Sequence, residues 1–256
     1  MFKALHIEWL KIRHYRTFWV LSILFLVAVL GINYISFEVK NSISHGRGDI
    51  LLGSPFAFPQ IWQTITWLSS FVLFIPGLFM ITLMTNEYNY KTHRQNIIDG
   101  WSRATFIKTK LVLVFIVALA VTGIVFLNVL LFGLSTGSDI SFDNVKYLLY
   151  FFIQALSYGS VALIIGLLIK RSGLSIAIFF LYSLIVENVL KAILNRYGGG
   201  SGNYLPLKTT DSLIPMPFIG DMLPHQPNIT TALIMSGIYL ILYYLLANWK
   251  FKTADL

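Results

Sequence analysis

Six long stretches of this chain carry almost no Asp, Glu, Lys or Arg, and the charged residues gather between them. A helix needs about 20 apolar residues to cross a hydrocarbon layer roughly 30 Å thick, and backbone groups in lipid must pair within their own segment. The pattern therefore predicts an all-α polytopic membrane protein that forms a single transmembrane domain over residues 1–256. We expect six transmembrane helices, at about residues 17–37, 59–85, 111–134, 147–169, 172–190 and 229–248. Pro76 lies inside the second, where its missing backbone donor predicts a kink.

The segment before the first span has a helical pattern of its own. Apolar residues recur on one face, at Phe2, Leu5, Trp9 and Ile12. Polar residues fall on the other face, among them Lys3, Lys11 and His14. This amphipathic pattern predicts an N-terminal helix that lies in the membrane interface.

The composition supports a surface that faces lipid. Charged residues make up only 12% of the chain, against about 25% in soluble domains. The net charge of +8 needs no nucleic-acid partner, because 13 of the 19 Lys and Arg residues lie in segments that are cytoplasmic if the N-terminus is inside. Such a bias is typical of cytoplasmic loops, so we expect both termini in the cytoplasm. The absence of cysteine excludes disulfides and thiolate metal sites.

The most informative polar segment is residues 86–110, between the second and third spans. Residues 92–98 are expected to form a short helix that ends at Asp99 and Gly100. Ser102 is placed to cap a second helix that leads into the third span. The segment would then present a short helix on two transmembrane stems, a shape suited to docking into a groove of another protein. The competing interpretation is an ordinary solvated loop.

This segment resembles the coupling region of ABC type-2 exporter permeases. In that family a Glu after the second span is followed by a short helix with Thr and a basic residue, a turn, a Ser-Arg pair and a Lys that enters the third span. The matching residues here are Glu87, Thr92, Arg94, Gly100, Ser102, Arg103 and Lys110. Residues 8–13 and 16–19 also resemble that family's entry into its first span. One departure is Lys91-Thr92, where the family usually has Gly-Thr.

The resemblance implies a homodimer of six-helix subunits in membrane lipid, in a bacterial cytoplasmic membrane. Each subunit would dock on a nucleotide-binding ATPase subunit, which would hold the ATP and Mg²⁺, so no cofactor is expected on this chain. The residues expected to couple the two subunits are Glu87, Tyr88, Thr92, Arg94, Gln95, Gly100, Ser102 and Arg103. The family also has short re-entrant helices after its fifth span, which would fall at residues 187–195.

Glu187 is the acidic residue closest to a membrane interior, and acids in such positions are functional candidates. Lys191 lies four residues later, so a helical ion pair is one interpretation, with proton coupling or substrate contact as the others. The chain has neither a phosphate-binding Gly-x-x-x-x-Gly-Lys-Ser/Thr loop nor a metal-ligand motif. We therefore expect no catalytic residue, no metal site and no enzymatic activity here.

The leading hypothesis is an exporter permease, and the sparse charge in the spans favours an amphipathic cargo such as a lipid, drug or peptide. Three alternatives stay open: an ion-coupled transporter that acts alone, a membrane-embedded enzyme, and a non-transporting subunit that transmits ATPase motion to extracytoplasmic partners. An ion-coupled transporter predicts several buried ionisable residues, and an enzyme predicts convergent catalytic groups. Neither pattern is evident in the sequence.

Overall fold

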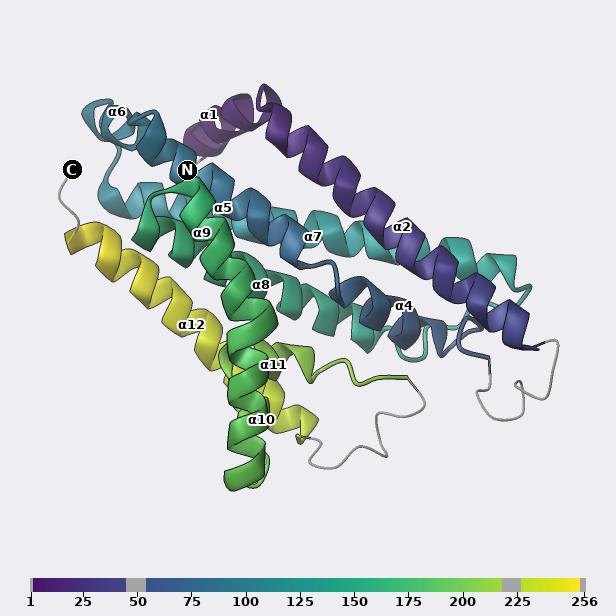
Figure 1. Ribbon diagram of the computed structural model, residues 1–256. Coiled ribbons are helices and arrows are strands. Elements are labelled where there is room, and N and C mark those ends of the chain that lie inside the picture. Colours follow the sequence, from purple (N-terminus) through teal and green to yellow (C-terminus); the bar gives the residue numbers. More distant parts are fainter. Residues whose placement is uncertain (1, 45–53, 218–226, 254–256) are drawn as a thin grey trace.

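The computed structural model describes residues 2–44, 54–217 and 227–253, and these residues form helices and turns without a strand (Figure 1). The longer helices are α1 (Phe2–Arg13), α2 (Arg16–Ser44), α4 (Ile61–Ser70), α5 (Phe74–Asn89), α7 (Arg103–Ser135), α8 (Lys146–Ile169), α9 (Ser172–Phe180), α10 (Glu187–Tyr197) and α12 (Ile229–Thr253). The short ones are α6 (Thr92–Ile98), a π-helical turn η1 (Leu181–Val186), a 3₁₀ turn η2 (Ser201–Tyr204) and α11 (Pro206–Asp211). The predicted all-α class is confirmed.

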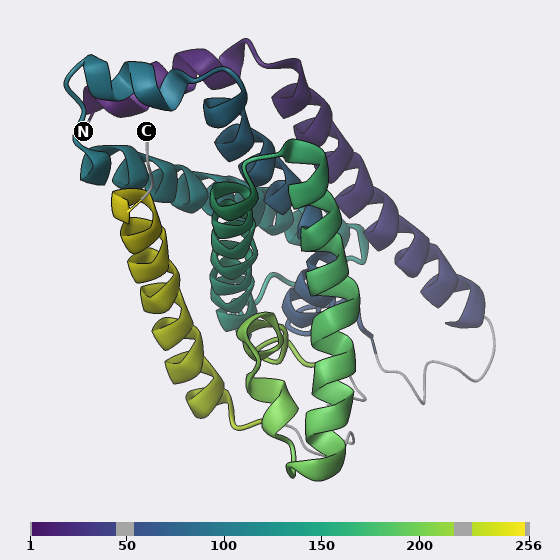
Figure 2. The same ribbon diagram turned by 60° about the vertical axis from the view of Figure 1, so that its left-hand side comes forward.

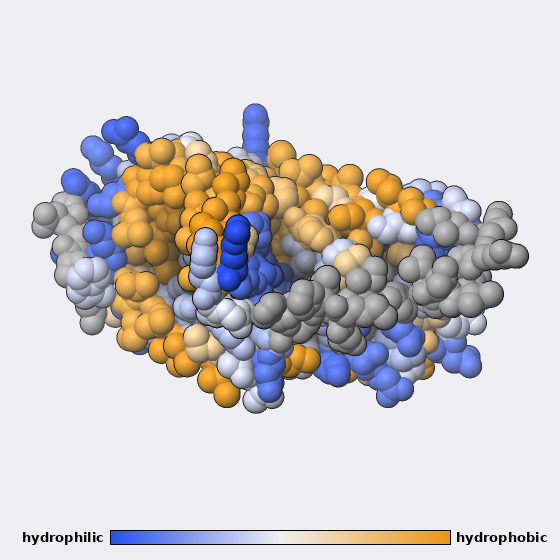
Figure 3. Space-filling model, turned by 60° about the horizontal axis from the view of Figure 1, so that its bottom comes forward, coloured by the Kyte–Doolittle hydropathy of each residue, from blue (hydrophilic) through white to orange (hydrophobic). Residues whose placement is uncertain are grey.

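In the described part of the chain, five helical segments are long and apolar enough to cross a membrane. They are α2, α7, α8, the continuous run α9–η1–α10, and α12. The pair α4 and α5 makes a sixth if it is counted as one span, although it is bent by 45°. Five to six candidate spans therefore match the expectation from the hydropathy pattern. Figure 3 shows a broad hydrophobic area over the middle of the molecule, with hydrophilic residues gathered at its left end and along its lower right edge.

The second span is bent by 45°, as the position of Pro76 predicts. The helix breaks at residues 71–73, between α4 and α5, and Pro76 is the third residue of α5. The first backbone N–H groups of a helix have no partner within it. Proline is tolerated in the first turn for this reason. Because Pro76 cannot donate to the carbonyl oxygen of Val72, four residues earlier, it favours a break at residues 71–73 and a new helix after it.

The fifth candidate span runs without a break from Ser172 to Tyr197 through the π-helical turn, beyond residue 190, where the sequence placed its end. Its last part, α10, includes residues 187–195, and a re-entrant role for them stays a prediction. Glu187 does not end the helix, and its carboxylate accepts hydrogen bonds within the fold. The chain turns back only after Tyr197, through η2 and α11, and α11 packs against α8 and α12 (Figure 2).

Small residues bring α5, α8 and α9 close together. A Cβ at Gly77 of α5 would lie 2.6 Å from the ring of Phe179, and one at Gly166 of α8 would lie 3.2 Å from Cβ of Met84. Close backbone approach of this kind is typical of helix packing in membranes. Both buried cores include residues of α5 and α8, which places these two helices at the centre of the bundle.

Candidate functional site

The short helix α6 forms with the bounds that its sequence predicts, Thr92–Ile98. Lys91 turns the chain out of α5 with a positive φ of 54°, and Gly100 follows α6 with a φ of +94°. Ser102 caps α7, since its hydroxyl accepts a hydrogen bond of 3.0 Å from the backbone N–H of Thr105. The turns at Lys91 and Gly100 and the cap at Ser102 thus explain where α6 begins and ends and where α7 begins.

The inner face of α6 is held against the end of α5. His93 and Asn96 are buried, and His93 Nδ1 lies 2.7 Å from the carbonyl oxygen of Glu87. A carbonyl only accepts hydrogen bonds, so Nδ1 carries the proton in this contact. The ring centroids of Tyr88 and His93 lie 4.7 Å apart. The ammonium of Lys170 lies over the ring of Tyr88, 5.0 Å from its centroid.

The outer face of α6 is free of the rest of the fold. Arg94 and Gln95 are exposed, and Ile98 is 77% exposed. These three side chains are therefore accessible to another molecule. Figure 1 places α6 at the end of the molecule that also holds α1.

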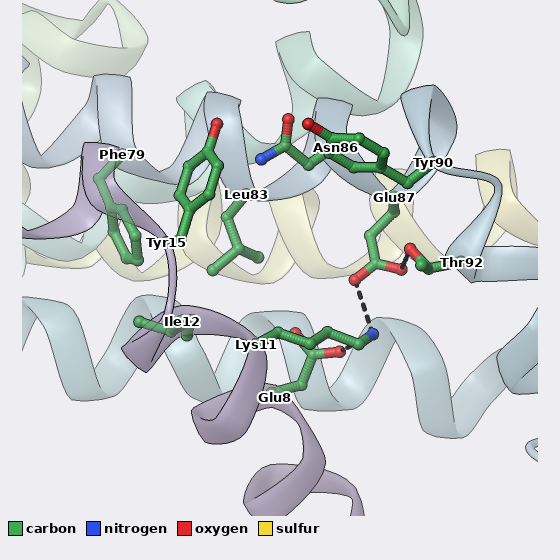
Figure 4. Close-up of a pocket in the computed structure, with 10 residues that line it drawn as sticks. All are labelled: Glu8, Lys11, Ile12, Tyr15, Phe79, Leu83, Asn86, Glu87, Tyr90 and Thr92. Carbon is green, nitrogen blue, oxygen red and sulfur yellow. Dashed lines mark hydrogen bonds and ion pairs between the residues drawn. The ribbon is translucent and has the colours of Figure 1, made fainter.

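Beneath α6 lies an ionic network of Glu8, Lys11, Glu87 and Lys110. Lys110 Nζ donates to Glu8 Oε2 and to Glu87 Oε1, each at 2.6 Å. Lys11 Nζ lies 3.0 Å from Glu8 Oε1 and 3.1 Å from Glu87 Oε1. Thr92 of α6 completes the arrangement by donating to Glu87 Oε2 at 2.6 Å (Figure 4). The network thereby joins α1, α5, α6 and α7.

The network is balanced in charge and mostly shielded from solvent. Two carboxylates face two ammonium groups, and Glu8, Glu87 and Lys110 are at most 3% exposed. Burial of the Lys11 ammonium opposes its charge, but the carboxylates of Glu87 and Glu8 outweigh this effect and raise the pKa of Lys11 above its usual value. Loss of a single partner from a buried ion pair costs about 3–5 kcal/mol, because the other charge stays buried without compensation. The network therefore holds α1, α5, α6 and α7 in their relative positions at this end of the molecule.

A pocket of about 190 Å³ opens beside the network, between α1 and α5. Its polar side includes Glu8, Lys11 and Glu87, and Phe79 and Leu83 supply apolar wall. The pocket lies next to the network, and Lys11 remains in contact with Glu8 and Glu87.

The structure brings some of the predicted coupling residues together and leaves others apart. Glu87 and Thr92 are in direct contact within the network, and Tyr88 lies beside it. The remaining predicted residues lie on the outer face of α6, in the turn after it or at the start of α7, namely Arg94, Gln95, Gly100, Ser102 and Arg103. Their role in coupling stays a prediction.

Sequence reasoning missed Glu8 and Lys11 as members of the site. The residues of α1 that are buried in the fold are Ala4, Glu8 and Ile12, whereas Trp9 is 50% exposed. The position of this helix in the membrane interface stays a prediction. The sequence does contain a signal for this pairing, because Glu8 lies four positions after Ala4 and four before Ile12. An acidic residue therefore falls on the same helix face as apolar ones. A charge on an otherwise apolar stripe needs a partner when the stripe is buried.

Glu187 does not belong to this site. It lies at the start of α10, where its Oε1 accepts a hydrogen bond of 2.6 Å from Tyr182 Oη and one of 3.0 Å from the backbone N–H of Leu207. The helical ion pair with Lys191 is not formed, although both residues are described. A group of three His, Asp or Glu side chains able to hold a metal is likewise absent from the residues described.

Comparison with protein families gives a match to the ABC-2 family transporter protein over residues 4–186. The chain belongs to this family. The match covers α1 to η1 and so includes α6 and all four residues of the ionic network. ABC-2 permeases are multi-pass membrane subunits, and they normally work with a nucleotide-binding ATPase subunit. A comparison with curated proteins gave no match.

Proposed function

We propose that this chain is the permease subunit of an ATP-binding cassette exporter, which moves an amphipathic substrate across the bacterial cytoplasmic membrane. A separate nucleotide-binding subunit binds ATP with Mg²⁺ and hydrolyses it, and this chain carries no cofactor. Two copies of the chain form a homodimer in the lipid bilayer, as the resemblance to type-2 exporters implies.

The observation that supports this proposal best is the construction of α6. Its outer face, with Arg94, Gln95 and Ile98, is exposed. Its first residue, Thr92, donates to Glu87 in the buried network. An ATPase subunit docked on the outer face would therefore push on a rigid element, and the push would reach α1, α5 and α7 together.

The charge distribution supports cytoplasmic termini. Both α1 and the segment 86–110 are rich in Lys and Arg, and Figure 1 places α1, α6 and the end of α12 at the same end of the molecule. A cytoplasmic position for this end agrees with the positive-inside rule, and it puts α6 where an ATPase would bind.

The experiment that tests the proposal captures the tagged chain in a mild detergent and identifies co-purifying proteins by mass spectrometry. We expect an ATPase with a Walker motif in equal amount. The Arg94→Ala variant should lose most of this ATPase and of the ATP hydrolysis that depends on the complex. Arg196→Ala is the matched control, because Arg196 is an exposed arginine on α10, and it should keep both.

Retention of the ATPase by Arg94→Ala at the level of Arg196→Ala would count against α6 as the docking element. A preparation without any ATPase in several detergents would instead favour an ion-coupled transporter that acts alone. If the complex forms and hydrolyses ATP but reconstituted vesicles move no amphiphile, a non-transporting subunit that passes ATPase motion to extracytoplasmic partners becomes the better interpretation.

A further inference from the structure

Two neighbouring pockets form a seam along one face of α5, polar at one end and apolar at the other. The pocket beside the ionic network is the polar end, and Asn86, Glu87 and Tyr90 are in its lining. A second pocket, of about 120 Å³, is the apolar end, and Ile75 is in its lining. Phe79 lines both pockets, so one follows the other directly along the helix. The opposite wall of this α5 seam comes from α1 and α2.

The length of the α5 seam matches one leaflet of a bilayer. Ile75 and Tyr90, at its two ends, are 15 positions apart, which is about 22 Å of helix at 1.5 Å per residue. A bilayer with its headgroup regions is roughly 40–45 Å thick, so one leaflet takes up about 20–22 Å. The polar end lies at the same end of the molecule as α1 and α6, which the proposed topology places in the cytoplasm. The α5 seam therefore has the depth and the polarity of a phospholipid in the cytoplasmic leaflet.

The polar end has no carboxylate oxygen left to accept a further hydrogen bond. Glu8 Oε1 accepts from Lys11, and Glu8 Oε2 accepts from Lys110. Glu87 Oε1 accepts from both lysines, and Glu87 Oε2 accepts from Thr92. An ammonium has three N–H donors, and Lys11 uses two of them here. One donor of Lys11 is therefore still available to a ligand.

Three more side chains in the lining have donors to offer. Tyr15, Asn86 and Tyr90 make no side-chain hydrogen bond within the described part of the chain, and in Figure 4 their polar ends gather on one side of the pocket, opposite Lys11. The Lys11 side chain is 32% exposed, whereas those of Glu8 and Glu87 are at most 4% exposed. The charge that a ligand meets here is therefore positive, and the matching ligand is an anion with several acceptor oxygens, as in a phosphate ester.

The bend between α1 and α2 adds positive charge at the same level. Residues 9–19 contain Lys11, Arg13 and Arg16 and no acidic residue, and both arginines are exposed. Trp9 and Trp19, which flank this stretch, are 50% and 51% exposed. Tryptophan is enriched at the level of the headgroups, and Lys and Arg are attracted to anionic lipids there. The bend thus favours an anionic headgroup over a zwitterionic one.

The apolar end suits an acyl chain. The rings of Phe18 of α2 and Phe79 of α5 pack on each other with centroids 5.1 Å apart, and both line this pocket. The other lining residues are apolar with the exception of Ser22 and come from three helices, namely Leu21, Phe25, Ile75, Pro76, Val117, Ala120, Val121 and Ile124. A chain in this pocket lies against α2, α5 and α7.

We propose that the α5 seam binds one anionic phospholipid of the cytoplasmic leaflet. Its headgroup oxygens accept hydrogen bonds from Lys11 on one side and from Asn86 and the two tyrosines on the other. Its acyl chain passes Phe79 and lies in the apolar end. The polar pocket, at about 190 Å³, is smaller than the roughly 300–1,000 Å³ that enclose a drug-sized ligand, so it holds the headgroup alone. The bound lipid ties the bend between α1 and α2 to the helix that carries Glu87. Only the choice of leaflet rests on the proposed topology.

The test measures lipid binding to the delipidated full chain in a mild detergent by native mass spectrometry. The probes are dioleoyl phosphatidylglycerol, which is anionic, and dioleoyl phosphatidylcholine, which has the same chains and a zwitterionic head. Glycerol phosphate is the soluble source of the same phosphate chemistry. We expect phosphatidylglycerol to bind at least about tenfold more tightly than phosphatidylcholine, the equivalent of one charge-assisted hydrogen bond. Equal binding of the two lipids, or binding of glycerol phosphate as tight as that of phosphatidylglycerol, would overturn the proposal.

Lys11→Gln removes the positive charge that faces the pocket. It should weaken phosphatidylglycerol binding at least about tenfold and leave phosphatidylcholine binding nearly unchanged. Lys3→Gln is the matched control, because Lys3 is exposed on the same helix, and it should bind phosphatidylglycerol as the wild type does. Equal binding by the two variants would contradict the role of Lys11.

Two other variants leave the ionic network intact, so they test the α5 seam even if Lys11→Gln folds poorly. Asn86→Leu should weaken phosphatidylglycerol binding about threefold, as for one neutral hydrogen bond, whereas Asn89→Leu, at an exposed position of α5, should not. Ser22→Trp fills the apolar end and should weaken binding more than about tenfold, and Ser22→Ala is its control. Wild-type binding by both Asn86→Leu and Ser22→Trp would refute the assignment of the α5 seam.

The outcome is independent of the proposed function. No ATPase is present in the binding assay, so a failure of the lipid proposal leaves the exporter assignment standing. A failure to find an ATPase partner leaves the measured lipid binding intact.

Discussion

Replacement of Lys110 by Met should destabilise the protein more than any single change on the surface of α7. The substitution keeps a long side chain and removes the one ammonium that is fully buried between Glu8 and Glu87. Breaking a buried ion pair costs about 3–5 kcal/mol. Lys11 still contacts both carboxylates after the change, so we expect the lower end, about 3 kcal/mol.

The assay is thermal unfolding of the purified chain in a mild detergent, followed by circular dichroism. For a chain of this size, 1 kcal/mol corresponds to about 2–4 °C, so Lys110→Met should lower Tm by about 6–12 °C. Lys108→Met is the matched control, because Lys108 is exposed on the same helix, and it should change stability by less than about 0.5 kcal/mol. Lys11→Met should cost at most about 1 kcal/mol, since the Lys11 side chain is 32% exposed and solvent screens its pairs.

The prediction is the order of the three effects: Lys110→Met lowers Tm most, Lys11→Met lowers it less, and Lys108→Met lowers it least. If Lys110→Met and Lys108→Met shift Tm equally, the ionic network does not hold this end of the bundle together. A double-mutant cycle of Lys110→Met with Glu8→Gln supplies an independent check, because partners in contact should deviate from additivity by at least about 0.5 kcal/mol.

Two further predictions concern the segment around α6 and the sidedness of the chain. Ser102→Ala removes the cap of α7 and should cost about 1 kcal/mol, whereas Ser102→Asp should retain most of the stability; equal Tm values for all three proteins would contradict the capping role. The chain has no cysteine, so Arg94→Cys and Tyr197→Cys supply single labelling sites in intact cells. An impermeant thiol reagent added outside should label Cys at position 197 and not at position 94, and the opposite result would overturn the proposed topology.

Local signals in the sequence were sufficient to predict α6 and its surroundings. The bounds of α6, the glycine turn and the Ser102 cap follow from residues within a few positions of one another. The approximate number of spans followed from hydropathy, because lipid imposes one requirement on about 20 consecutive residues.

Contacts between residues that are far apart in the sequence could not be predicted from it. Glu8 and Lys110 are 102 positions apart, and nothing local to either residue specifies the other. The same limit applies to the end of the fifth helical run. The sequence placed it near residue 190, but the helix continues to Tyr197, and Glu187 has donors on Tyr182 and on the backbone of Leu207, which no local pattern specifies.

The contact between α5 and α8 connects the ionic network physically to the middle of the bundle. Glu87 of the network lies on the last turn of α5. At Gly166 of α8 the two helices approach so closely that an added Cβ would lie 3.2 Å from Cβ of Met84. Packed interiors have low compressibility, so a contact of this kind transmits displacement instead of absorbing it. A push on α6 that moves the end of α5 must therefore also move α8.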